Sequence, residues 1–109
     1  MASGKLGNSV AILALQSPPQ IVYTVPTGIY TVANVSITNR NATSIRFRIA
    51  LSAGGTPSVQ EYIEYDTVLP GNSTFERTGL VLNASLNIQV YSDTANVGVT
   101  VYGIETSTS

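Results

Sequence analysis

The chain has 109 residues and a formal net charge of −1, a length that fits one domain. It contains no Cys, His or Trp, which excludes disulfides, zinc fingers and catalytic systems that use a thiol or an imidazole. Only 10% of the residues are charged, and five of them are basic. These are too few for the positive surface of a nucleic-acid-binding protein. We therefore expect no nucleic-acid partner, no metal and no cofactor.

The composition favours β structure. Val, Ile and Thr are abundant, whereas the strong helix formers Lys, Glu and Met are scarce, and β-branched side chains suit a pleated strand. Because a nearly uncharged surface repels copies of itself only weakly, the composition also favours assembly. The longest apolar run covers residues 10–15, far short of the roughly 20 residues that a membrane helix needs. We expect no membrane association, and the run is a poor match to a signal peptide.

Alternating apolar and polar residues, separated by Gly, Pro and Asn turns, predict the strands. We expect them at residues 10–15, 21–25, 29–39, 44–52, 61–69, 73–82, 86–91 and 97–105. This spacing is typical of an all-β antiparallel β-sandwich or jelly roll of about eight strands. The predicted organisation is an N-terminal arm (1–9), the sandwich domain (10–106) and a polar tail (107–109).

The N-terminal region offers candidate assembly contacts. Residues 1–9 are small and polar, which fits either a disordered terminus or an arm that orders against a neighbouring subunit. Residues 10–15, VAILAL, are apolar on both alternating faces and need cover on both sides. A second subunit and a loop of the same chain both remain open as that cover. The candidate contacts in this run are Val10, Ile12, Leu13 and Leu15.

Two arginines and two carboxylates are predicted to pair between neighbouring strands. If residues 44–52 and 61–69 pair across the loop between them, Arg46 and Arg48 face Glu64 and Asp66. Opposite charges on adjacent antiparallel strands help to fix the register. The arginines would keep both carboxylates ionised, so we favour structural pairing over calcium binding or glycosidase chemistry. We identify no catalytic residue and expect that the protein is not an enzyme.

Six tyrosines divide between the two faces of the predicted strands. Tyr23 and Tyr65 fall on inward-facing positions. Tyrosine is enriched where protein surfaces meet, so the outward tyrosines are candidate assembly contacts, with an ordinary surface role or a sugar site as alternatives. These outward residues are Tyr30, Tyr62, Tyr91 and Tyr102.

Several segments resemble small virion proteins of tailed bacteriophages. They are VPTGIYTV (25–32) with NVSITN (34–39), YIEYDT (62–67) with PGNST (70–74), and VYSDTANV (90–97) with GIE (103–105). The resemblance covers roughly residues 21–105 and is to a style of β-sandwich module. It implies a head decoration (cement) protein or a tail- or fibre-associated protein, commonly oligomeric and frequently trimeric. It transfers no catalytic residue.

Two functions follow as hypotheses. The first is a structural protein of a tailed-phage virion, a capsid decoration (cement) protein that stabilises the shell through subunit contacts. Its partners would be itself, as a homotrimer or other homo-oligomer, and the major capsid protein or other virion proteins; its location would be the virion. The alternative is a tail- or fibre-associated module that binds a host glycan or protein receptor through residues 53–60 and 92–96, with exposed tyrosines stacking on sugar rings.

Overall fold

The computed structural model of the chain describes residues 3–6, 10–15 and 19–107. This part consists almost entirely of β-strands, joined by turns and one short 3-10 helix, η1 (Val59–Glu61). The strands are β1 (Ser3–Lys5), β2 (Val10–Ile12), β3 (Gln20–Thr24), β4 (Ile29–Asn39), β5 (Ile45–Ser52), β6 (Tyr62–Leu69), β7 (Thr74–Leu82), β8 (Asn87–Ser92) and β9 (Val97–Ser107). No helix among the described residues has the length and apolar character needed to cross a membrane.

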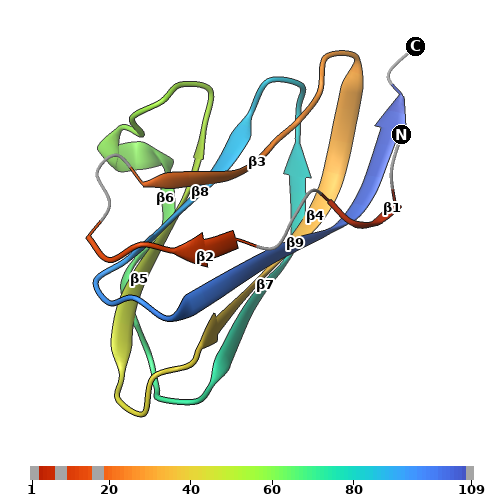
Figure 1. Cartoon of the computed structure of the whole chain (residues 1–109). Coiled ribbons are helices and arrows are strands. Elements are labelled where there is room, and N and C mark those ends of the chain that lie inside the picture. The colour runs from red at the N-terminus through yellow and green to blue at the C-terminus, as the bar shows by residue number, and fades with distance from the viewer. Residues whose placement is uncertain (1–2, 7–9, 16–18, 108–109) are drawn as a thin grey trace.

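The strands form two antiparallel sheets that pack face to face as a sandwich (Figure 1). One sheet has the order β1-β9-β4-β7, with β2 also pairing β9, and the other has the order β3-β8-β5-β6. The pairing is nested: β5 pairs β6, β4 pairs β7, β3 pairs β8 and β2 pairs β9. A long antiparallel hairpin rolled over two sheets gives this nesting, which is the jelly-roll arrangement. The predicted all-β sandwich is confirmed.

The core lies between the sheets and follows the alternation of the sequence. In β4 every second residue is buried from Thr31 to Asn39, and in β5 the inward side chains include Ile45, Phe47 and Ile49. Phe47 meets Phe75 of β7 with ring centroids 4.8 Å apart, so the aromatic rings link the two sheets. Alternation predicts a strand with one buried face, and these strands have it.

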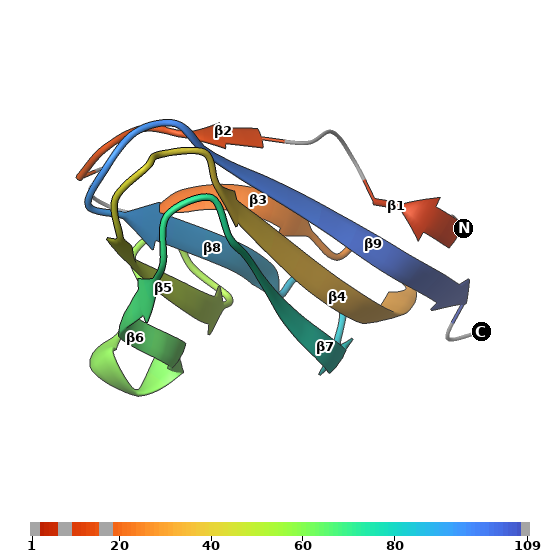
Figure 2. The same cartoon turned by 90° about the horizontal axis from the view of Figure 1, so that it is seen from below.

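The N-terminal region lies along the edge of β9. Within the stretch expected to be an arm, β1 pairs with β9 of the same chain, and the buried Leu6 donates its backbone N–H to the Val101 carbonyl at 2.7 Å. β2 then pairs with the first part of β9. Figures 1 and 2 show β1 and β2 one after the other beside β9. The predicted strand over residues 10–15 is therefore shorter than expected, because regular pairing ends at Ile12.

A buried asparagine fastens the turns at one end of the sandwich. Asn39 is fully buried, and its Nδ2 donates to the carbonyls of Thr43, Leu69 and Pro70 at 3.0–3.2 Å. Its Oδ1 accepts the backbone N–H of Asn41 at 2.9 Å. Buried polar groups need such partners, so one side chain holds the β4–β5 turn against the β6–β7 turn.

Candidate functional site

An arginine lies between two tyrosine rings on the outer face of the β3-β8-β5-β6 sheet. The Arg48 Cζ atom is 4.2 Å from the ring centroid of Tyr65 and 4.5 Å from that of Tyr91. The rings of Tyr62 and Tyr65 meet edge to face with centroids 5.2 Å apart. A guanidinium over an aromatic face is attracted by the ring electrons. Residues of β5, β6 and β8 thus form one cluster, which we call the Tyr–Arg cluster (Arg48, Tyr62, Tyr65, Asp66 and Tyr91).

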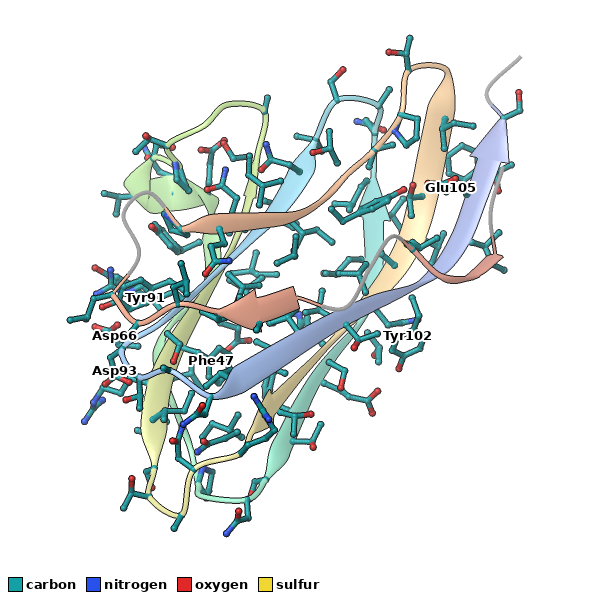
Figure 3. The ribbon with its side chains drawn as sticks, in the orientation of Figure 1. Phe47, Asp66, Tyr91, Asp93, Tyr102 and Glu105 are labelled. Atoms are coloured by element: carbon teal, nitrogen blue, oxygen red, sulfur yellow. The ribbon has the colours of Figure 1, made fainter. Side chains whose placement is uncertain are left out.

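Asp66 completes the cluster through an ion pair. Arg48 Nε donates to Asp66 Oδ1 at 2.6 Å and Nη2 donates to Oδ2 at 3.3 Å. This hydrogen bond lowers the pKa of the Asp66 carboxyl and raises that of Arg48. Figure 3 shows Asp66 and Tyr91 grouped near Asp93 at one end of the molecule. The arrangement holds the long Arg48 side chain in place before any partner binds.

A β-bulge in β6 creates the cluster. It also places Tyr65 on the opposite face from the one predicted. Phe47 pairs with Thr67 and Ile49 pairs with Glu64, so two residues of β6 lie opposite Arg48 alone. Asp66 takes a left-handed conformation, φ 50°, which Asp tolerates better than most residues. The extra residue turns Tyr65 outward, where 55% of its surface is exposed, and the predicted inward position was wrong.

The same bulge separates the two carboxylates that were predicted to share a face. Glu64 lies opposite the core residue Ile49, so it points between the sheets and pairs with Arg77 of β7 at 2.7 Å. Its predicted pairing with Arg46 and Arg48 is corrected for that reason. Arg46 contacts the backbone carbonyl of Asp66 at 3.4 Å. The structure therefore brings together only one of the expected ion pairs, Arg48 with Asp66.

The candidate contacts in residues 10–15 divide between core and surface. Ile12 is only 2% exposed, and it belongs to the protein's own core and not to an assembly surface. Leu13 and Leu15 are 60% and 64% exposed. Leu15 donates its N–H to the Ser92 carbonyl at 2.9 Å, which places this segment beside the end of β8, next to Tyr91. The Val10 side chain lies outside the described part.

The outer face of the other sheet carries an apolar row across three strands. Val32 of β4 pairs with Val81 of β7 on one side and with Ile104 of β9 on the other. Paired residues share a face, and all three side chains are substantially exposed. Figure 2 shows β7, β4 and β9 side by side. We call the outward positions of these three strands the β4 face.

The remaining candidate tyrosines lie on this β4 face. Tyr30 is exposed at the start of β4. Tyr102, on β9, is half-buried and its hydroxyl donates to Glu76 of β7. That hydrogen bond raises the pKa of Tyr102 and ties the two strands that flank β4. Tyr30 and Tyr102 therefore lie on the opposite sheet from Tyr62 and Tyr91.

The loop of residues 53–60, one of the two expected to bind a ligand in the alternative function, covers part of the outer face of β8. The Gly54 carbonyl accepts hydrogen bonds from Asn87 Nδ2 and Gln89 Nε2, each at 3.0 Å. Both amides are buried. Among the described residues, no group of three or more acidic side chains could hold a metal ion, and no pocket opens on the surface they form.

Some contacts of the candidate site were not predicted from the sequence. The outward position of Val32 follows from alternation, but its partners Val81 and Ile104 depend on the pairing of strands far apart in the sequence. The ion pair of Arg77 with Glu64 was not predicted, because the inward position of Glu64 depends on the bulge. Strand order and bulges, both non-local features, decide these contacts.

Comparison with known proteins gives no relative: no family model, no curated protein and no solved structure matches the chain.

Proposed function

We propose that the protein is a structural protein of a tailed-phage virion, a decoration (cement) protein that stabilises the capsid shell. The observation that carries the proposal is the presence of exposed apolar and aromatic side chains on both outer faces of the sandwich. The β4 face presents Val32, Val81 and Ile104, and the opposite sheet presents the Tyr–Arg cluster near Leu13 and Leu15.

Two such faces suit a protein that joins other subunits. A decoration protein binds its own copies and the shell beneath, so it needs two contact surfaces. Tyr and Arg are enriched among the residues that dominate binding energy at interfaces. The Tyr–Arg cluster provides both types, held in place by the 2.6 Å ion pair of Arg48 with Asp66. The resemblance of residues 21–105 to phage virion modules supports the same role.

Immunogold electron microscopy tests the proposal. Antiserum against the protein is applied to purified particles of the phage that encodes it. We expect gold label distributed over the head at many copies per particle. Label confined to the tail or fibres would favour the alternative below, and particles without label would refute both. Binding of the purified protein to shells that lack it gives a second measurement, in which Tyr65→Ser combined with Tyr91→Ser should weaken binding.

The alternative, a tail- or fibre-associated module that binds a host receptor, is favoured by one observation. The exposed ring of Tyr65 and the ring of Tyr91 flank a guanidinium at the end of the molecule that carries Asp93 (Figure 3). Aromatic rings beside hydrogen-bonding groups suit a sugar ring. A glycan array in which Tyr65→Ala abolishes a specific signal would support this function over capsid decoration.

A further inference from the structure

We propose that the β4 face is a self-association surface, which pairs with the same face of a second copy across a two-fold axis. This inference deepens the proposed function by naming the partner of one of its two faces, and it rests on that function for its biological setting. The face is centred on the row formed by Val81, Val32 and Ile104.

The first argument is the exposure of this row. Val81 is 68%, Ile104 57% and Val32 40% exposed, although the three side chains are neighbours in one row across the sheet. Tyr30 extends the apolar surface two residues along β4 from Val32. Contiguous exposed apolar groups on a sheet face are typical of an interaction surface. Single exposed valines are common on protein surfaces. Three exposed apolar side chains paired in one row across the sheet are the feature that indicates a contact surface.

The second argument is charge. Glu76 is the one charged residue at the described outward positions of β4, β7 and β9, and it already accepts the Tyr102 hydroxyl proton in a hydrogen bond. The other polar residues on the face are neutral, among them Asn34, Ser36 and Thr38. Hydroxyls and side-chain amides both donate and accept hydrogen bonds, so they can hydrogen-bond to the same residues of a second copy of the chain. A strongly charged partner would find no complement here, whereas a second copy meets little repulsion.

The third argument is size. β4 and β9 have 11 residues each and β7 has nine, so the three strands present a projected area of about 500 Å² at ordinary strand spacing. Side-chain relief raises the accessible area above this projection, toward the ~800 Å² per partner of a stable interface. Sheets pack face to face with strands roughly aligned, and a face that pairs with itself closes as a dimer.

Sedimentation equilibrium of the whole protein tests the pairing. We expect a dimer at micromolar concentration, and we expect the double variant Val81→Glu and Ile104→Glu to weaken dimerisation at least 100-fold. Both positions are exposed, so the fold should persist, which circular dichroism checks. The matched control is Val68→Glu, a 51% exposed residue on β6 of the other sheet, which should leave the dimer intact.

Three results would overturn the inference: a monomer at 100 μM, a trimer, or a dimer that the double variant leaves unchanged. Because the chain has no Cys, Val32→Cys gives an independent measurement. Oxidation should trap a disulfide dimer through the centre of the face, and failure to cross-link a dimer would contradict the two-fold arrangement. A monomer that still labels virion heads would refute only the pairing. A dimer absent from virions would refute only the proposed function.

Discussion

The carboxylate of Glu64 in β6 accepts a 2.7 Å hydrogen bond from the guanidinium of Arg77 in β7, and so links the two sheets. Each of these strands is the last in its sheet, so the ion pair lies on the side of the sandwich where both sheets end. Thr67 donates a further hydrogen bond to Glu64 at 2.9 Å. The Glu64 side chain is only 17% exposed, and a carboxylate so placed depends on its partners.

Arg77→Met should lower the free energy of unfolding by about 1–2 kcal/mol, because it leaves a mostly buried carboxylate without its cation. Urea denaturation measures the change. The control Arg46→Met removes an exposed arginine whose guanidinium donates to the backbone carbonyl of Asp66 at 3.4 Å, and we expect it to stay within about 0.5 kcal/mol of the parent protein. Equal losses in the two variants would mean that the inter-sheet pair contributes nothing specific.

A second prediction concerns the titration of Asp66. The hydrogen bond from Arg48 is the main cause that lowers the pKa of this carboxyl, and the more distant charge of Arg46 lowers it less. In Arg48→Met the pKa of Asp66 should rise toward its ordinary value, and in Arg46→Met it should rise by a smaller amount. NMR titration of the side-chain carboxyl measures both. An Asp66 pKa that does not move in Arg48→Met would contradict the ion pair.

The sequence predicted the fold well because most strands bury one face only. In β4 and β5 the alternation of apolar and polar residues identifies the core side chains directly, since each pleat places successive residues on opposite faces. The turns between these strands contain Gly, Pro and Asn, which mark chain reversals. Strand ends were therefore predicted to within one or two residues, except in the N-terminal region.

The candidate site was less predictable because it depends on interruptions of that alternation. The bulge at Asp66 reverses the faces of Tyr65 and Glu64, and no periodicity in a single strand reveals an extra residue. The buried amide of Gln89 depends on a loop that crosses from another part of the chain. In residues 10–15, apolar character on both faces could not indicate that Ile12 enters the core while Leu13 remains outside.

The buried hydroxyl of Tyr23 should make the stability of the protein depend on pH in the alkaline range. Its ring is buried, as expected from the sequence, and its hydroxyl bonds Glu105 at 2.5 Å and Thr31 at 2.9 Å. Burial, followed by the hydrogen bond to Glu105, raises the pKa of Tyr23 from 10.0 to about 12. Between these two values the folded state keeps the hydroxyl proton while the unfolded chain releases it.

The stabilisation from this group should therefore be complete below pH 10 and lost as the pH rises through 12, by about 3 kcal/mol in total. Unfolding in urea at pH 9, 10, 11 and 12 measures the slope, and Tyr23→Phe should make it shallower. Tyr30→Phe is the control, because Tyr30 lies on the exposed outer face. If Tyr23→Phe keeps the full slope of the parent protein, another group causes the alkaline loss.

Two glycines of β9 provide a matched test of the contact between β9 and β4. Gly103 pairs with Ala33 and has a φ of +153°, and a Cβ placed on it would lie 2.0 Å from the carbonyl oxygen of Val32. Gly98 lies on the same strand, and a Cβ there would meet nothing within 4 Å. The two positions therefore differ in the space beside the backbone, although both lie on a strand that pairs with β4.

Gly103→Ala should cost at least about 2 kcal/mol of unfolding free energy, because the obstructing atom belongs to the β4 backbone and cannot rotate away as a side chain would. Gly98→Ala should be neutral or slightly stabilising, since alanine reduces the freedom of the unfolded chain. Urea denaturation of both variants measures the difference. Equal unfolding free energies for the two variants would show that β9 can move away from Val32 at no cost. The close pairing of β4 with β9 would then not be needed for the stability of the β4 face.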